Sequence, residues 1–580
     1  MRIACRWVIG VLCLVVVAGS VVSAQSVADS YTPVTDEMLV DPAPGDWPMW
    51  RRTYGHWGHS PLDQINTSNV GTLRLAWAWT MGEGLQETTP LVHDGMMFLV
   101  QACDFVEALD VRDGSRIWQY RRERVDHAAR LSCANRNGAL YQDKLFIATH
   151  DAHLVALDAR TGDVAWDVEV GDWTIGQHYS GGPMVIKGRV VAGMSGCYHL
   201  NTRCWVSAHD VDTGEEAWRT YTIPGRGEFG YDSWGDVPDE DRRGGSAWNS
   251  PSYDPELNLI YTGVGVPIPW GSVQRGTGDG DVLYTNSTLA LNADTGDIVW
   301  YFQHIPNDEW DLDHPYARLV VETEVSPDAA VRWKNSSITP GGRRKIVTGI
   351  PGKTGIVWAL DAATGAFLWA EPTNHQNVVV DIDAESRRVI LNSALKFPEV
   401  GKPVFVCPSA LGGINWQATA YHPGTNALYA PTNNVCMDLT LNQFRDRPGA
   451  HHGSARIAQA PAPDIDGEIG QFTAMDLTTG QPLWVYRQRA GMGGSVLTTG
   501  GGLVFVTDDA RRFRAFDARS GDILWEQILN SSAGGFPVSY MHDGVQYLAI
   551  AAGGGINFRG LTPEIQQPGR GNTLFVFKLP

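Results

Sequence analysis

Short stretches in which apolar and polar residues alternate fill most of the chain, and each stretch ends at a turn signal. A period of two is typical of β-strands that bury one face. One phrase follows many of these stretches: Ala-Leu-Asp, two variable residues, Thr-Gly, three variable residues and Trp. With variations it occurs at 108–118, 156–166, 208–218, 290–300, 359–369, 474–484 and 515–525. The pattern therefore predicts a repeated β-hairpin rather than a helical bundle.

Each part of the phrase has a physical role. The Asp side chain can accept backbone hydrogen bonds across the turn. The Gly permits the positive φ that a tight hairpin needs. The Trp offers a broad face that can wedge against the neighbouring repeat. Because each unit buries a face only when it is stacked on another, the repeats predict an all-β fold, a β-propeller with tryptophan-docking motifs.

We expect eight blades. Seven copies of the phrase are clear, and residues 421–431 look like a blade strand whose phrase has degenerated. Strands at 73–77 and 573–577 lie near the two ends of the chain, so we expect them to complete one blade and close the ring. The predicted organisation is a single propeller domain over residues 25–580. A seven-bladed ring is the alternative.

The first residues are typical of a secretory signal peptide. Arg2 and Arg6 precede an apolar run at 8–17, and small residues follow at 22–24. This predicts a leader over residues 1–24 and export to the periplasm. The run is short for a membrane span, and we expect none in the mature chain. An uncleaved anchor is the alternative.

Charge and cysteine content narrow the partners and the compartment. The formal net charge is −19, which argues against a nucleic-acid partner and an anionic membrane surface. Six cysteines lie outside the predicted leader, and an even number in an oxidising compartment indicates disulfides. The expected pairs are Cys197 with Cys204, Cys407 with Cys436, and Cys103 with Cys133, among fifteen connectivities.

Several phrases between the repeats carry candidate chemistry: 86–92, 135–136, 244–248, 353–355 and 412–416. Together with the repeats they resemble the quinoprotein alcohol dehydrogenases, eight-bladed propellers that hold pyrroloquinoline quinone (PQQ) on the ring axis. The resemblance covers nearly the whole mature chain. PQQ has three carboxylates and a planar quinone, so its site needs fixed cations and a flat aromatic face. The resemblance implies the following cofactor-binding residues: Glu87, Arg136, Thr149, Ser195, Gly196, Ser246, Trp248, Lys353, Asn415 and Trp416.

The resemblance also assigns roles. Arg136 would bind a cofactor carboxylate, Trp248 would form the floor under the quinone, and Lys353 would donate to the quinone oxygens and act in catalysis. The acidic phrase at 308–313 resembles the active-site phrase of the family, which makes Asp311 the general base for an alcohol hydroxyl. Asp313 would be an additional metal ligand, as in lanthanide-type members.

Two positions depart from the family pattern at the metal. Tyr198 stands where the family has a ligating Glu, and Val266 stands where it has a ligating Asn. A calcium or lanthanide ion would then depend on Asp311 and Asp313, with PQQ and water supplying further oxygens. The alternative is that Lys353 serves as the electrophile in place of a metal.

Other departures concern the pocket and the partners. Methanol-type members have adjacent cysteines above the quinone, whereas this chain has only Cys133 there, and Met492 stands where many members have Trp. We therefore expect a bulkier or secondary alcohol as substrate. The chain has no Cys-x-x-Cys-His haem motif, so a separate cytochrome c is the expected electron acceptor. A cofactor-free binding scaffold and a hydrolase with paired acids are the alternatives.

Overall fold

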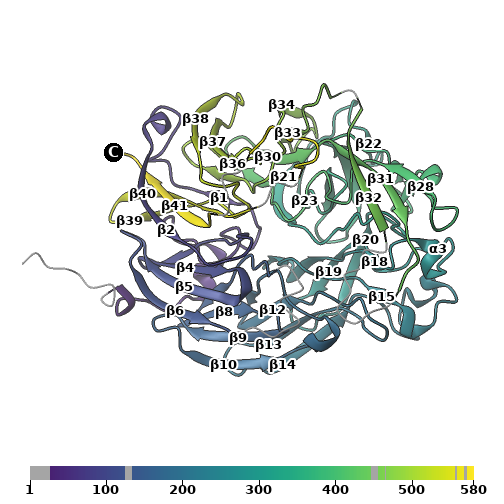
Figure 1. The fold of residues 1–580 in the computed structure, drawn as a ribbon, viewed down its shortest axis with the longest axis horizontal. Coiled ribbons are helices and arrows are strands. Elements are labelled where there is room, and N and C mark those ends of the chain that lie inside the picture. Colours follow the sequence, from purple (N-terminus) through teal and green to yellow (C-terminus); the bar gives the residue numbers. More distant parts are fainter. Residues whose placement is uncertain (1–26, 124–132, 446–454, 464, 555–557, 567–570) are drawn as a thin grey trace, which may run out of the picture.

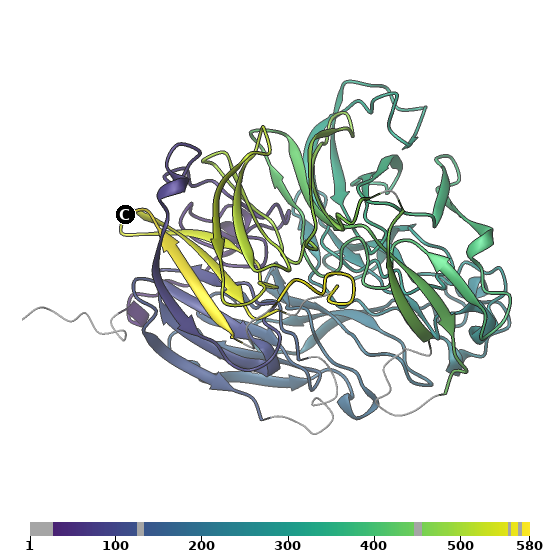
Figure 2. The ribbon, with the colours of Figure 1, turned by 45° about the horizontal axis from the view of Figure 1, so that its top comes forward.

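The computed structural model describes residues 27–123, 133–445, 455–463, 465–554, 558–566 and 571–580. The predicted leader, residues 1–24, lies outside them. Strands dominate, and the sheets stand around a common centre (Figures 1 and 2). The described helices are short, and none of them is long and apolar enough to cross a membrane.

Eight sheets of four or five strands lie in the described part of the chain. The first four contain β3 (Leu91–His93), β4 (Met96–Gln101), β5 (Phe105–Asp110) and β6 (Arg116–Arg121); β7 (Ala139–Tyr141), β8 (Lys144–Ala148), β9 (His153–Asp158) and β10 (Val164–Glu169); β11 (Met184–Ile186), β12 (Arg189–Gly193), β13 (Trp205–Asp210) and β14 (Glu216–Tyr221); and β16 (Ser252–Asp254), β17 (Leu259–Gly263), β19 (Ser287–Asn292) and β20 (Ile298–Gln303).

The next three contain β21 (Leu319–Val325), β23 (Gly342–Gly349), β24 (Ile356–Asp361), β25 (Phe367–Pro372) and β22 (Trp333–Lys334); β29 (Ala420–His422), β30 (Ala427–Asn433), β33 (Gly470–Asp476) and β34 (Pro482–Gln488); and β35 (Leu497–Thr499), β36 (Leu503–Thr507), β37 (Arg512–Asp517) and β38 (Ile523–Ile528), with β1 (His59–Ser60) at the edge. Neighbours in these sheets are antiparallel, except that β1 pairs with β35 in parallel.

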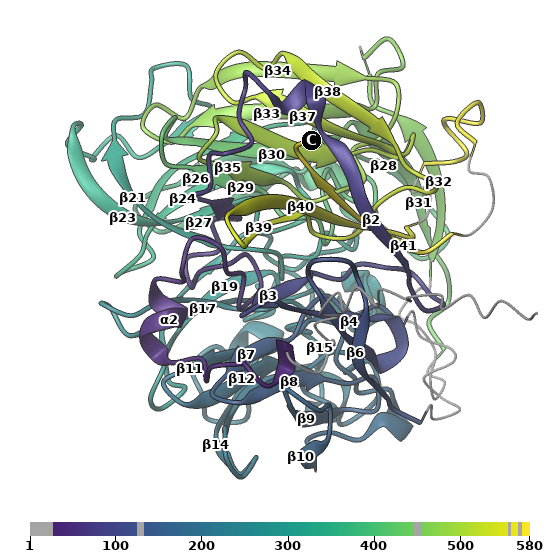
Figure 3. The ribbon, with the colours of Figure 1, turned by 90° about the vertical axis from the view of Figure 1, so that its left-hand side faces the viewer.

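The remaining large sheet joins the two ends of the chain. β2 (Arg74–Thr80) pairs with β41 (Thr573–Lys578), which continues to β40 (Val545–Ala552) and β39 (Val538–His542). Figure 3 shows β2 lying beside β41. The predicted all-β propeller is confirmed, whereas the expected number of blades stays a prediction for a chain described with gaps.

The Trp of the repeat docks on the next sheet, as the phrase predicts. The indole N–H of Trp118 donates to the carbonyl of Ala159 at 2.9 Å, and that of Trp218 donates to Ala293 at 3.2 Å. Beneath the Trp218 ring lies Gly296, whose φ is +78° and where a Cβ would approach the ring to 2.6 Å. The glycine therefore serves both the turn and the close approach of the indole.

Smaller elements connect or cover the ring. They are α2 (Asp36–Val40) and α3 (Ser272–Arg275), the pairs β15 (Arg243–Gly244) with β18 (Pro267–Ile268) and β26 (Val379–Asp383) with β27 (Arg388–Leu391), and the sheet of β28 (Pro403–Val406), β31 (Val435–Leu441) and β32 (Ala455–Pro461).

The three predicted disulfides are present: Cys103–Cys133, Cys197–Cys204 and Cys407–Cys436.

Candidate active site

The predicted site residues come from two kinds of loop. Glu87, Arg136, Trp248 and Asp311 precede the first strand of a sheet, whereas Lys353 lies between the second and third strands. Because the strands of a sheet alternate in direction, both kinds of loop emerge at the same end of the ring. Residues far apart in the sequence can therefore face one another there.

The two predicted acids and the predicted lysine meet in an ion-paired group. The ammonium of Lys353 lies 2.8 Å from Oδ2 of Asp311 and 3.2 Å from Oδ2 of Asp313. Lys353 is 4% exposed and Asp311 is 7% exposed, so water reaches this contact poorly. The second oxygen of Asp313 accepts the backbone N–H of Val266 at 3.0 Å.

A carboxylate that sequence reasoning passed over holds the loop of Asp311. Asp308 accepts the backbone N–H groups of Trp310, Asp311 and Leu312 at 2.8, 2.9 and 3.1 Å. Asn286 donates to the same carboxylate at 3.1 Å. Asp311 has a φ of +63°, a left-handed conformation that costs energy in a non-glycine residue, and Asp308 stabilises it. The acidic phrase contained Asp308, but only the fold reveals its backbone partners.

Burial dominates the ionisation of these acids. It raises the pKa of Asp311 well above its ordinary value, and the Lys353 ammonium offsets only part of this rise while Asp313 adds to it. Burial also raises the pKa of Asp308 to about 6, partly offset by its backbone donors. Asp311 is consequently a stronger proton acceptor than an exposed aspartate.

An aromatic wall adjoins the acids. Trp248 is partly exposed and lines one pocket with Asp311, Asp313 and other residues. The guanidinium carbon of Arg136 lies 4.9 Å from the centre of the Trp248 ring. Arg136 also forms an ion pair with Glu87 at 2.6 Å, and burial raises the pKa of that carboxyl despite the arginine. The structure thus brings together three of the predicted cofactor-binding residues.

A tyrosine that the sequence did not single out connects this wall to Asn415. Tyr316 meets Trp248 edge to face, with ring centres 5.2 Å apart, and its hydroxyl donates to Asn415 at 3.1 Å. Trp416, the next residue, donates its indole N–H to Gly534 at 3.3 Å and lines a second small pocket with Asn415. No sequence phrase marked Tyr316, because its role depends on contacts with distant loops.

Of the predicted small residues, Ser246 lies at the pocket beside the acids, whereas Ser195 and Gly196 pack against the segment at 176–178. Ser246 lines that pocket directly. Ser195 pairs with His178 through the backbone, and Gly196 packs so closely against Gly176 that a Cβ would lie 1.9 Å from the Gly176 carbonyl oxygen. Glycine is therefore required at 196 for packing, whatever its role toward a cofactor.

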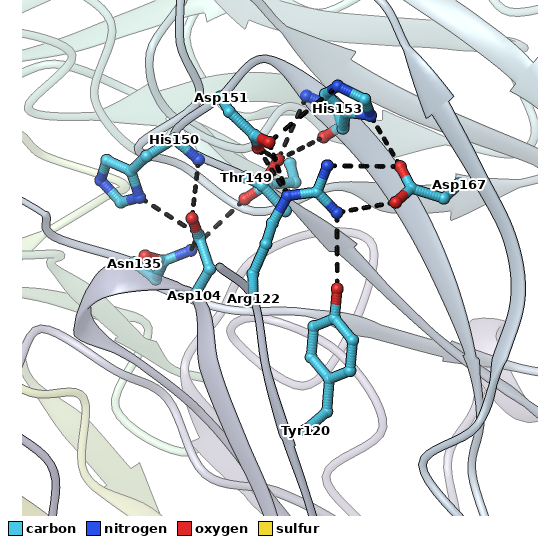
Figure 4. Close-up of polar contacts among 10 residues, drawn as sticks. Asp104, Tyr120, Arg122, Asn135, Thr149, His150, Asp151, His153 and Asp167 are labelled. Atoms are coloured by element: carbon cyan, nitrogen blue, oxygen red, sulfur yellow. Dashed lines mark hydrogen bonds and ion pairs between the residues drawn. The ribbon is translucent and has the colours of Figure 1, made fainter. Parts of the chain in front are cut away.

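Thr149 belongs to a separate polar network (Figure 4). Its hydroxyl donates to Asp151 at 2.5 Å. Arg122 donates to Asp151 at 2.7 Å and to Asp167 at 2.8 Å, and His153 contacts Asp167 at 2.7 Å. The hydroxyl of Thr149 is committed to this network, so its predicted contact with a cofactor stays a prediction.

The described residues fit PQQ. Arg136 Nε and Ser195 Oγ are buried without a hydrogen-bond partner in the described part of the chain, as expected for groups that receive a ligand carboxylate or carbonyl. The partly exposed Trp248 ring supplies the flat face that a planar quinone requires.

The described residues do not provide a ligand set for calcium or a lanthanide. The pocket beside Asp311 and Asp313 is lined by Tyr198, Ser246 and Val266, together with the Trp248 ring. The described residues contain no group of three His, Cys, Asp or Glu side chains that could hold a metal ion. A calcium ion requires six to eight oxygen ligands, and beyond the oxygens of PQQ and water it would depend on two carboxylates that are already paired with Lys353.

Comparison with known proteins assigns this chain to a family. Residues 47–331 and 466–548 match the family model described as "PQQ: Glucose/ethanol/alcohol dehydrogenase, beta-propeller domain". The chain is 34% identical over 548 residues to the quinohemoprotein alcohol dehydrogenase ADH-IIG of Pseudomonas putida, covering 89% of this chain and 74% of that protein. It is 33% identical over 555 residues to the quinoprotein alcohol dehydrogenase PedH of Pseudomonas putida, covering 90% of this chain and 89% of that protein.

Solved structures agree. A structure of ADHIIG from Pseudomonas putida has a TM-score of 0.85 at 32% identity, covering 95% of this chain and 82% of that one. A europium-containing methanol dehydrogenase has a TM-score of 0.83 at 28% identity, covering 94% of this chain and 100% of that one. The family model covers more than half of the chain, and the relatives cover most of it. The chain therefore belongs to the PQQ-dependent alcohol dehydrogenases.

Proposed function

We propose that this chain oxidises an alcohol to an aldehyde or ketone in the periplasm and passes the electrons to a separate cytochrome c. The observation that carries the proposal is the ion-paired group of buried Asp311, buried Lys353 and half-buried Asp313 beside the partly exposed ring of Trp248. A binding scaffold has no need of such a group, because burying charged side chains costs free energy.

Asp311 is the proton acceptor in this reaction. PQQ, when bound, accepts the two electrons and the carbon-bound hydrogen of the alcohol. Asp311 accepts the hydroxyl proton, and its burial raises its pKa and so strengthens it as a base. The Lys353 ammonium, 2.8 Å away, fixes the orientation of the carboxylate and stabilises negative charge that develops nearby.

The electron acceptor follows from what the chain contains. The given sequence has no Cys-x-x-Cys-His motif, which supports transfer of the two electrons to a separate molecule. The net charge of −19 favours association with a basic partner such as a cytochrome c. Salt dependence of the reduction rate of a basic cytochrome c tests this step, and a rate independent of ionic strength contradicts it.

The proposed substrate is a bulky or secondary alcohol. The small pocket at Asn415 has apolar surface from Leu411, Trp416 and Phe558 beside the amides of Asn415, Gln417 and Asn433, so it offers contacts for an apolar substituent next to polar groups. Met492 itself is fully buried in the core with Phe472, so it supports this proposal less directly than the sequence suggested. Faster turnover of methanol than of larger alcohols contradicts the proposal.

Export is a separate part of the proposal and has its own measurement. Expression of the full chain followed by N-terminal sequencing of the periplasmic fraction is expected to identify a protein that begins at Gln25. Retention of the whole product in the cytoplasm contradicts it.

The main experiment is reconstitution of the purified protein with PQQ, followed by dye reduction over a panel of primary and secondary alcohols. We expect PQQ-dependent turnover that falls about 100-fold or more in Asp311→Asn, because the substitution removes the proton acceptor and keeps its shape. Asp383→Asn, at the exposed end of β26, is the matched control and should retain activity. Absence of PQQ binding in the unaltered protein overturns the proposal.

A further inference from the structure

The carboxylate oxygens of Asp311 and Asp313 already have partners. The Lys353 ammonium forms an ion pair with one oxygen of each carboxylate, and the backbone N–H of Val266 donates a hydrogen bond to the second oxygen of Asp313. Three of the four oxygens are thus engaged by donors of this chain. A metal ion would have to compete with a buried ammonium and a fixed backbone N–H for its ligands.

The rest of the pocket offers no replacement for a metal ligand set. Val266 has no side-chain donor atom, and Tyr198 presents a phenol whose pKa burial raises, so it stays neutral. Ser246 adds one hydroxyl. Hard cations prefer several carboxylate oxygens, and the described residues that line this pocket include no carboxylate besides Asp311 and Asp313.

The main chain holds the lysine firmly in place. The N–H of Lys353 donates to the carbonyl of Asp313 at 2.8 Å, and its carbonyl accepts from Gly413 at 2.7 Å. Its stem packs against Gly412, where a Cβ would come within 2.9 Å of Lys353 Cγ. These contacts hold the backbone and the first part of the stem, and the two carboxylates hold the ammonium at its end.

We propose that the ammonium of Lys353 is the resident cation of this site, and that the chain binds PQQ without a divalent or trivalent metal ion. The inference rests on the proposed function, because it presumes that the site binds PQQ. It distinguishes this chain from its structural neighbour, the europium-containing methanol dehydrogenase.

The first test measures PQQ binding rather than turnover. The full-length protein is stripped of metal and titrated with PQQ in chelator, in calcium chloride or in lanthanum chloride, with tryptophan fluorescence and melting temperature as readouts. We expect the same PQQ affinity within about twofold in all three and less than about one metal ion per ten chains by elemental analysis. A PQQ affinity at least about tenfold weaker in chelator overturns the inference and leaves the proposed function intact. Absence of PQQ binding in all three overturns both.

The second test restores the missing ligands. The double variant Tyr198→Glu with Val266→Asn adds a carboxylate and an amide oxygen to the pocket, and Tyr198→Phe with Val266→Leu is the matched control without new oxygens. With terbium alone as the probe, we expect luminescence sensitised by Trp248 in the first variant only, with an affinity at least about tenfold above that of the unaltered protein.

Terbium binding by the unaltered protein as tight as by the Glu/Asn variant, lost in Asp313→Asn, overturns the inference, because the native residues would then suffice for a metal. This readout does not depend on PQQ and so stays informative if the Glu/Asn variant loses activity.

Discussion

Removal of the Asp308 side chain should disable the loop that presents Asp311. In Asp308→Ala, three backbone N–H groups at positions 310 to 312 lose their acceptor, as does the amide of Asn286. Hydrogen bonds to a charged group contribute about 1.5–3 kcal/mol each, and water or local rearrangement recovers part of this. We therefore expect a loss of stability on the order of 3–5 kcal/mol.

Turnover by Asp308→Ala should fall by more than the loss of folded protein alone would explain. The left-handed φ of Asp311 is held by these bonds, so its carboxylate should move from its working position, and a displacement of about 1 Å can cost about 100-fold in rate. Asp308→Asn should be intermediate: one oxygen remains to accept from Trp310 and Asp311, while the new NH2 group faces the Leu312 N–H.

The assay combines turnover, denaturant unfolding and amide hydrogen exchange of residues 309–313. Asp210→Ala is the matched control, because Asp210 also accepts two backbone N–H groups, at 3.0 Å each, but at an exposed repeat turn. It should lower stability by about 1 kcal/mol and leave turnover unchanged. Exchange rates and turnover in Asp308→Ala that match those of the unaltered protein would refute the reasoning.

Two further predictions concern the scaffold. Gly296→Ala should lower the free energy of unfolding by about 2–4 kcal/mol, because the new Cβ meets the Trp218 ring and alanine is also strained in the left-handed conformation. Gly188→Ala, the control, should lower it by only about 1–2 kcal/mol, since nothing lies within 4 Å of its Cβ. Equal losses of stability in denaturant unfolding would contradict the docking argument. Burial lowers the pKa of His56 and of His314 to about 3. Below the unfolded pKa of about 6.5, each histidine binds a proton in the unfolded state but stays neutral in the folded state. The free energy of unfolding therefore falls by up to about 1.4 kcal/mol per pH unit for each histidine as the pH falls from about 6.5 toward 3. Unfolding free energies that stay constant from pH 7 to pH 4.5 would contradict this.

The sequence reveals the features that repeat along the chain. The docking of Trp118 on the next sheet and the turn at Gly296 follow from local patterns. The even number of cysteines indicates disulfides, but the count leaves fifteen connectivities, and the fold decides among them. The pairing of Lys353 with Asp311 spans 42 residues, and no local pattern encodes it. The family resemblance identified Lys353 and Asp311 as site residues, but only the fold shows that their side chains are in contact.

Other parts of the site are invisible in the sequence because the backbone makes them. The N–H of Val266 that takes an oxygen of Asp313 would be present with almost any residue at 266. The backbone N–H groups that donate to the Asp308 carboxylate lie next to it only in the folded loop. Thr149 is predicted by resemblance, and the fold adds a contact that the sequence does not indicate: its hydroxyl donates to Asp151.

The main-chain contacts also bear on how the site keeps its geometry. Carboxylates that bind a metal ion are also oriented by hydrogen bonds from the surrounding polypeptide. Here the N–H of Val266 fixes Asp313, Asp308 fixes the loop of Asp311, and the carbonyl of Asp313 fixes the backbone of Lys353. Each charged group thus has its own support from the polypeptide. The lysine needs such neighbours in particular, because its four-carbon stem is flexible and its ammonium has no fixed direction of its own. The supports of Asp311, Asp313 and Lys353 therefore keep the proposed ammonium within reach of both carboxylates.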